Sequence, residues 1–409
     1  ETTSPLPVFA TGFELWWLAL TAFVLINALA FSTNIGAAIK TAVDAFALPL
    51  VAFHTARHFL GSNNHGKWVL LGAIILAFLL VSVGTYEIIT GNDALAYKGA
   101  ELVREGELRV NGPFASDSSY SVISALIFIF LLAAPRVFEI KLDQGGRIVY
   151  WLSVAAAGIS AMLPFFRVTA IAIATSWILL ELAAKRGSVA KQLLRLTARG
   201  RTSRGGDNPN TDGPITSRRR LVTFTIGSFA LAALLASSVI FLAPAPLRER
   251  LLSFRNAYGR LATWSVAARI AYDHPLLGAG LGNYEDQFHE IYSGRNLPLE
   301  LSLDTHAASE PHSNLVSIAT ELGAAGLLLY LLANYYLLKL GYRGLVAANS
   351  GTSRTAAACF IALFVVYSIP GLMLTSGAYS DLNLCFFFLL GLLSTQFRVK
   401  PAGAEAISA

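Results

Sequence analysis

The stretch Glu310 to Leu338, EPHSNLVSIATELGAAGLLLYLLANYYLL, joins a short polar segment to a long apolar one. Its apolar part, from about residue 314 to 338, is longer than the roughly 20 residues that an α-helix needs to cross a bilayer. The polar part ends on Pro311, His312, Ser313 and Asn314. The stretch therefore predicts a membrane-spanning helix that begins beside a histidine facing water.

Similar apolar runs recur along the whole chain. Of 409 residues, 55% are hydrophobic and 14% are charged, and mean hydropathy is +0.56, whereas soluble domains carry about 25% charged residues. Backbone groups in hydrocarbon must bond within their own segment, which favours helices over the alternating strands of a barrel. We expect an all-α polytopic membrane protein with spans near 12–31, 35–53, 68–90, 119–134, 148–165, 167–184, 221–243, 314–338, 356–374 and 381–397. Because the chain begins with Glu1, we allow for a further segment and expect ten to twelve helices.

The basic residues predict the orientation, since Lys and Arg are retained in cytoplasmic loops. Residues 185–220 carry ten Lys and Arg against two Asp, so we expect a cytoplasmic basic loop, disordered between Arg201 and Ser217. Its charge is explained by topology and by affinity for anionic membrane lipids, and nucleic-acid binding is not expected. Because successive spans cross the membrane in opposite directions, residues 244–312 are then expected on the periplasmic side. Six basic and eight acidic residues in that segment show no cytoplasmic bias.

The sequence thus divides into three parts. Residues 1–243 hold the N-terminal transmembrane helices and the basic loop, 244–312 form a helical periplasmic domain, and 313–409 hold the C-terminal transmembrane helices. The exported part has helical periodicity between about 247 and 273, which predicts amphipathic helices at the membrane surface. Cys359 and Cys385 are the only cysteines and both lie in predicted spans, so a disulfide framework and a cysteine zinc site are excluded.

Glycine occupies every second position in Gly278-Ala279-Gly280-Leu281-Gly282. A phosphate-binding loop would need a preceding strand and either a lysine or a different glycine spacing, and these are absent. The pattern favours a tight turn that lets the backbone approach another element or a ligand closely.

Two motifs carry a resemblance to a known family. His274-Pro275-Leu276 through Gly278-x-Gly280-x-Gly282-Asn283-Tyr284, followed by His312-x-Asn314-Leu315 and Glu321-x-Gly323-x-x-Gly326-Leu327, resembles the C-terminal signature of the O-antigen ligase and polymerase superfamily. Arg260, Trp264 and Arg167 also match family positions. Ser313 is a departure, because many relatives have histidine followed directly by asparagine. The resemblance spans about residues 160–330.

The resemblance implies a GT-C-like glycosyltransferase of the inner membrane that works at the periplasmic face. It would move O-antigen glycan from undecaprenyl diphosphate to the lipid A core. His312 would be the general base, Arg167 and Arg260 would be catalytic groups that bind the diphosphate, and Trp264 and Asn314 would bind substrate. No metal and no cofactor are expected, because no Asp-x-Asp pair occurs and arginine can hold phosphate oxygens in a two-pronged geometry.

The residue chemistry by itself leaves other interpretations open. Arg167 at a helix end can be a snorkelling anchor, Arg260 a headgroup contact, and His312 a surface or capping residue. A neutral imidazole nevertheless suits proton removal near pH 7, and a helix N-terminus helps to keep it neutral. An O-antigen polymerase or a protein O-oligosaccharyltransferase would use the same chemistry. A transporter of polyprenyl-linked glycans is the alternative from another class, but it would be expected to show internal repeats and helices broken at the midplane.

Overall fold

The computed structural model divides the chain into two compact units, residues 1–180 with 259–409, and residues 181–258. The first unit holds every predicted site residue. The structure describes residues 12–59, 63–92, 103–104, 107–108, 110–114, 116–164, 166–199, 255–293, 310–375 and 379–397.

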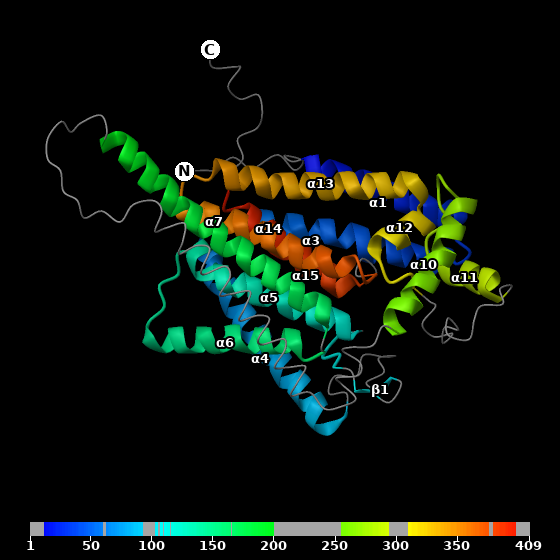
Figure 1. Ribbon diagram of the computed structural model, residues 1–409, viewed down its shortest axis with the longest axis horizontal. Coiled ribbons are helices and arrows are strands. Elements are labelled where there is room, and N and C mark those ends of the chain that lie inside the picture. The colour runs from blue at the N-terminus through cyan, green and yellow to red at the C-terminus, as the bar shows by residue number, and fades with distance from the viewer. Residues whose placement is uncertain are drawn as a thin grey trace, which may run out of the picture. The chain divides into compact units, whose positions relative to one another are not determined.

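Helices make up nearly all of the described structure (Figure 1). A two-residue antiparallel ladder, β1 (Val103–Arg104) with β2 (Glu107–Leu108), is the exception among the described residues. The helices are α1 (Gly12–Phe31), α2 (Ile35–Ala42), the π-helix η1 (Val43–Ala47), α3 (Leu48–Phe59), α4 (Asn63–Thr90), α5 (Asp117–Val137), α6 (Gln144–Met162), α7 (Arg167–Arg199), α10 (Arg255–Asp273), α11 (Tyr284–Ser293), α12 (Asn314–Glu321), α13 (Gly323–Ala347), α14 (Gly351–Gly371) and α15 (Ser380–Ser394).

Six described helical segments are long and apolar enough to cross a membrane, which confirms a multi-pass membrane protein. They are Gly12–Phe31, Ile35–His58, His65–Thr90, Asp117–Val137, Gly323–Ala347 and Gly351–Gly371. The shorter apolar helix α15 matches the last predicted span, and α6 and α7 form where two further spans were predicted. The predicted span 221–243 lies outside the described residues. The total of ten to twelve spans stays a prediction.

The predicted span 314–338 was wrong at its beginning. The helix is interrupted at Leu322, so that α12 ends at Glu321 and the apolar helix α13 begins at Gly323. Gly323 has a φ of 66°, a left-handed conformation that costs a residue with a side chain about 1–2 kcal/mol. The interruption turns the predicted first two turns of the span into a separate helix.

Side-chain caps fix where several helices begin. Ser116, Asp143 and Ser350 each accept a hydrogen bond from the backbone N–H three residues later. They therefore satisfy N–H groups that have no partner within α5, α6 and α14.

Polar contacts define the two ends of the bundle. We call one end the loop end, after residues 274–283, which lie there. At this end α1 finishes at Phe31 and α13 begins at Gly323. Ser121 of α5 bonds the Ala161 carbonyl near the end of α6, and Ser119 contacts Asp381 of α15, so these termini meet at one level. The opposite ends of these helices carry basic residues, namely Arg136, Lys141, Arg147, Lys339, Arg343 and Arg354.

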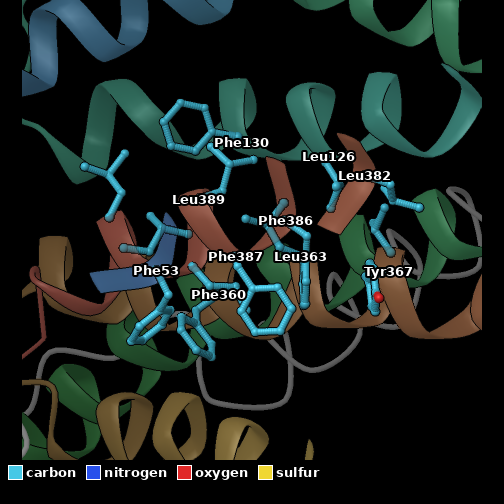
Figure 2. Close-up of a cluster of buried hydrophobic side chains, with 14 of the residues drawn as sticks. Phe53, Leu126, Phe130, Phe360, Leu363, Tyr367, Leu382, Phe386, Phe387 and Leu389 are labelled. Atoms are coloured by element: carbon cyan, nitrogen blue, oxygen red, sulfur yellow. The ribbon is translucent and has the colours of Figure 1, made fainter. Parts of the chain in front are cut away.

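The core of the bundle lies around α15, which packs against α3, α5 and α14 (Figure 2). Phe386 and Phe387 are fully buried there, and the Phe386 ring stacks on Tyr367 at a centroid distance of 4.1 Å. Gly391 lets α15 approach the backbone of α3, since a Cβ at this position would meet the Phe53 carbonyl oxygen. Close backbone contact of this kind is how small residues stabilise helix pairs in membranes.

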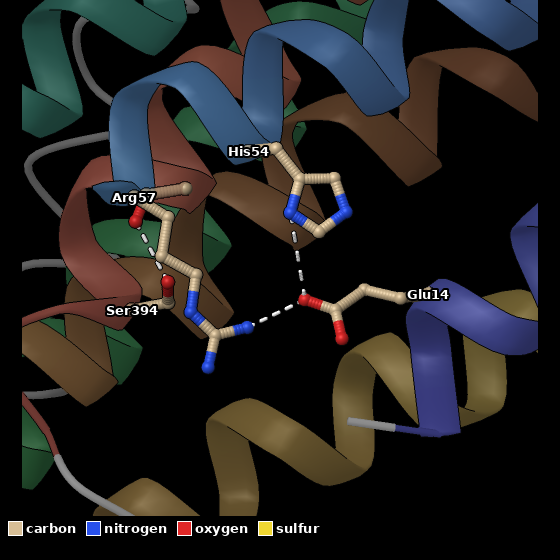
Figure 3. Close-up of polar contacts among 5 residues, drawn as sticks. Glu14, His54, Arg57 and Ser394 are labelled. Atoms are coloured by element: carbon tan, nitrogen blue, oxygen red, sulfur yellow. Dashed lines mark hydrogen bonds and ion pairs between the residues drawn. The ribbon is translucent and has the colours of Figure 1, made fainter. Parts of the chain in front are cut away.

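A buried ion pair joins α1 to α3 (Figure 3). Arg57 Nη1 lies 2.6 Å from Glu14 Oε1, and their side chains are 8% and 0% exposed. His54 Nδ1 lies 4.0 Å from the same oxygen. The Glu14 charge is thus matched within the bundle, as burial of a charge in an apolar environment requires.

We predict that Arg57→Ala will lower the free energy of unfolding by about 3–5 kcal/mol, because it leaves the Glu14 carboxylate buried without its partner. Thermal unfolding of the purified protein in lipid nanodiscs measures this loss. Arg269→Ala is the matched control, since its pair with Asp273 is largely exposed and should contribute at most about 1 kcal/mol. Equal stability of the two variants would show that the Arg57–Glu14 ion pair does not stabilise the bundle.

Candidate functional site

The glycine loop, residues 274–283, packs its backbone directly against the α12–α13 interruption. Gly278, Gly280 and Gly282 all have positive φ, of 75°, 101° and 80°. A Cβ at Gly278 would lie 2.3 Å from the Glu321 carbonyl group, and one at Gly323 would lie 2.4 Å from the Leu276 oxygen. The prediction of a tight turn that allows close backbone approach is confirmed.

Backbone hydrogen bonds hold these two segments together. Ala279 and Gly280 donate to the carbonyls of Thr320 and Glu321, over 2.9 and 3.0 Å, and Ala324 donates to Pro275 over 2.9 Å. The last carbonyls of α12 and the first N–H groups of α13 cannot be satisfied within their own helices. The loop supplies their partners, so the interrupted helix is stable only with the loop in place.

Two asparagines bind the same loop to the end of α1. The Asn27 side chain donates to the Leu277 carbonyl over 2.7 Å and accepts from the Leu281 N–H over 3.0 Å. Asn283 donates to the Phe31 carbonyl and accepts from the Thr33 N–H. Both asparagines are buried. Asn27 was not predicted as important, although a polar residue inside an apolar span is a recognisable signal.

Helices α10, α11 and α12 lie together at the loop end (Figure 1). Val266 and Ile270 of α10 form a small second core with Tyr284 and Phe288 of α11, and Val316 of α12 packs on it. The Tyr284 hydroxyl donates to the Thr263 carbonyl over 3.2 Å. The predicted helical character of this region is confirmed for residues 255–273 and 284–293.

Trp264 fixes the segment that carries His312. Its indole N–H donates to the Pro311 carbonyl over 2.8 Å. The indole N–H that could bind substrate is therefore engaged within the protein. A substrate contact through the Trp264 ring stays a prediction.

His312 lies just outside α12, where Ser313 is the N-cap residue and Asn314 is the first helical residue. His312 therefore lies beside the short helix α12 and not, as predicted, beside the start of a membrane-spanning helix. Its φ is 50°, which is uncommon for a residue other than glycine and costs of order 1–3 kcal/mol. Such strain at a partly buried histidine is typical of functional sites.

Arg260 is a half-buried cation on α10, one helical turn before Trp264. Burial lowers the pKa of its guanidinium, and no described carboxylate pairs with it. Residues four apart lie on the same face of a helix, so Arg260 shares a face with the indole that contacts Pro311. Arg260 therefore lies on the face of α10 that contacts the segment before His312, and no described carboxylate pairs with it.

Arg167 lies at the loop end as well. It is the exposed first residue of α7 and follows the end of α6, where Ala161 contacts α5. Tyr379 lies close to Asp117 at the start of α5 and also to Glu310. Because Glu310 is two residues before His312, His312 lies at the same end of the bundle as the start of α5. Arg167 and His312 therefore share one end of the bundle, and the distance between them is not fixed by these contacts.

A cavity of about 60 Å³ lies beneath α12. A water molecule needs about 10–15 Å³ of such space, so the cavity can hold a few waters and is too small for a sugar. Asn314 lines it and bonds the Tyr330 hydroxyl. Other polar lining residues are Thr41, Ser317, Glu321, Tyr367, Thr375 and Asn383.

Two carboxyl groups at this end were given no role from the sequence. Burial raises the pKa of Glu321 to about 7, while hydrogen bonds from the Gly282 and Tyr284 backbone N–H groups oppose that shift. Burial also raises the pKa of Glu310, against the effect of the Thr375 hydroxyl. The available signal was an acidic residue within or next to an apolar run.

No protein-family model matches the chain, and no curated protein matches it. The described residues include no group of three His, Cys, Asp or Glu side chains that could hold a metal ion. Metal independence stays a prediction.

We predict that Gly278→Ala will destabilise the protein far more than Gly282→Ala. Both positions have positive φ, which costs an alanine about 1–2 kcal/mol. Only at Gly278 would the new Cβ collide with backbone, since at Gly282 nothing lies within 4 Å. Thermal unfolding in nanodiscs should show a drop of at least ~3 kcal/mol for Gly278→Ala. Two equal drops would mean that the loop does not contact the α12–α13 junction.

Proposed function

We propose that this protein is a membrane glycosyltransferase of the O-antigen ligase type, with a GT-C-like fold. It transfers O-antigen glycan from undecaprenyl diphosphate to the lipid A core at the periplasmic face of the bacterial inner membrane. The proposal rests on the two motifs, whose residues come together at the loop end, and on the state of Arg260.

Arg260 is the observation that carries the proposal. A half-buried guanidinium that no carboxylate of the described residues pairs with is costly unless an anion binds beside it. Its position on α10, one turn from the indole that bonds Pro311, brings that anion next to His312. A diphosphate is the anion that guanidinium groups bind best, through paired charge-assisted hydrogen bonds.

The reaction needs three events at one place. An acceptor hydroxyl oxygen forms a bond to the anomeric carbon of the glycan, the bond from that carbon to the diphosphate oxygen breaks, and the hydroxyl proton passes to the His312 imidazole. The leaving diphosphate keeps the electron pair. Arg260 and Arg167 stabilise this charge as it develops, without a metal ion. The imidazolium then returns its proton to water.

The distribution of polar groups supports an enzyme over a transporter. A transporter binds its substrate near the midplane, between helices broken there. Here Arg167, Arg260, Glu310 and His312 belong to one end of the bundle, and the helix interruption at Leu322 lies beside the loop at that end. The lipid A core as acceptor comes from the resemblance, and a polymerase or a protein O-oligosaccharyltransferase would use the same residues on another acceptor.

We predict that His312→Ala and Arg167→Ala will abolish transfer, and that Arg260→Ala will reduce it at least ~10-fold, the loss expected for one charge-assisted contact in the transition state. The measurement is transfer in proteoliposomes that contain the purified protein, lipid-linked glycan and lipid A core. The same assay in EDTA should proceed at full rate.

Two variants control for charge and for histidine content. Arg269→Ala removes an exposed arginine from the same helix, and His289→Ala removes an exposed histidine from α11, and neither should alter the rate. Near-normal transfer by His312→Ala or Arg167→Ala would remove that residue from the mechanism. A requirement for added Mg²⁺ or Mn²⁺ would refute metal independence, and movement of the glycan across the membrane without transfer would identify a transporter.

A further inference from the structure

Glu321 is a partly buried acid that the proposed reaction does not use. It is the last residue of α12, and His312 lies two residues before the first residue of the same helix. Its carboxylate accepts hydrogen bonds from the backbone N–H groups of Gly282 and Tyr284, and its carbonyl accepts one from Gly280. One residue therefore binds two N–H groups of the glycine loop and the N–H of Tyr284, the first residue of α11.

Tyr284 transmits this attachment to α10. Its N–H is held by Glu321, its hydroxyl bonds the Thr263 carbonyl over 3.2 Å, and its ring is almost fully buried. Thr263 lies between Arg260 and Trp264 in the same helical turn, and its own hydroxyl bonds the Arg260 carbonyl over 2.9 Å. A change in the position of Tyr284 would displace the turn that carries Arg260.

Trp264 closes the path back to α12. Its indole N–H bonds the Pro311 carbonyl, and His312 is the next residue. The contacts form a ring that leads from Glu321 through Tyr284, the Arg260–Trp264 turn and Pro311 to His312, and back along the eight residues of α12. In such a ring, the distance between Arg260 and His312 depends on the contact at Glu321.

We propose that Glu321 is a positioning residue, whose carboxylate holds the glycine loop so that Arg260 and His312 face one substrate. This inference rests on the proposed function, and it concerns a residue that touches neither the sugar nor the diphosphate. Its effect appears in turnover because the two groups must stay in register for the transition state, where a small displacement is costly.

The test combines hydrogen exchange with kinetics on the full-length protein in nanodiscs. Glu321→Ala should speed amide exchange in residues 278–284 at least ~10-fold and lower kcat for transfer by about 10- to 100-fold, the scale of a misplaced reacting group. Glu321→Gln keeps an acceptor oxygen, so it should retain most of the amide protection and most of the wild-type kcat. Tyr284→Phe removes only the bond to Thr263, so it should lower kcat while Gly282 stays protected.

Glu285→Ala is the matched control, since Glu285 is an exposed carboxylate on α11 next to the same loop, and it should change neither measurement. Unchanged exchange in Glu321→Ala, or faster exchange with wild-type kcat per folded molecule, would overturn the proposal. If Glu321→Ala does not fold, the proposal would be overturned by a Tyr284→Phe variant that keeps the wild-type kcat. Absence of transfer by the wild-type protein would refute the proposed function instead, while exchange would still report whether Glu321 holds the loop.

Discussion

The contact between Gly278 and the Glu321 carbonyl group is the constraint on which this structure depends. No side chain fits between these two backbones, and the contact lets a loop on one side satisfy the open ends of two helices on the other. Through it, α10 and α11 are attached to the bundle. The positions of Arg260, Trp264 and His312 all follow from that attachment.

Two arginines show how differently the molecule treats buried charge. Arg57 at one end is matched by Glu14 at 2.6 Å, so its charge serves stability. Arg260 at the other end is half-buried without a described acidic partner. The contrast favours a structural role for the first and, under the proposed function, a binding role for the second, because a bound anion would offset the cost of burying the cation.

Composition and periodicity predicted the helical membrane class and most of the helices, because apolar length decides whether a segment can cross a bilayer. The alternating glycines predicted a close backbone approach, because that pattern has few other uses. The sequence could not show what the loop approaches. Asn27 and Leu277, or Asn283 and Phe31, are about 250 residues apart in the chain, and only the folded structure pairs them.

Local chemistry also predicted less of the site than of the fold. A continuous apolar run disguised the interruption at Leu322, since its one visible signal is Gly323, a residue common in membrane helices. Nothing in the sequence indicated that the Trp264 indole N–H holds Pro311, and a substrate contact through its ring stays a prediction. Glu321 was a visible acid without an assigned role, because its partners are backbone N–H groups that no side-chain motif encodes.

The most direct test of the account is a structure of the protein in nanodiscs with a polyprenyl diphosphate bound, determined by electron cryomicroscopy. The account predicts diphosphate density against the Arg260 guanidinium, with the His312 imidazole facing the same space. Density at the opposite end of the bundle, beside Arg136 or Arg354, or no density near Arg260, would contradict it.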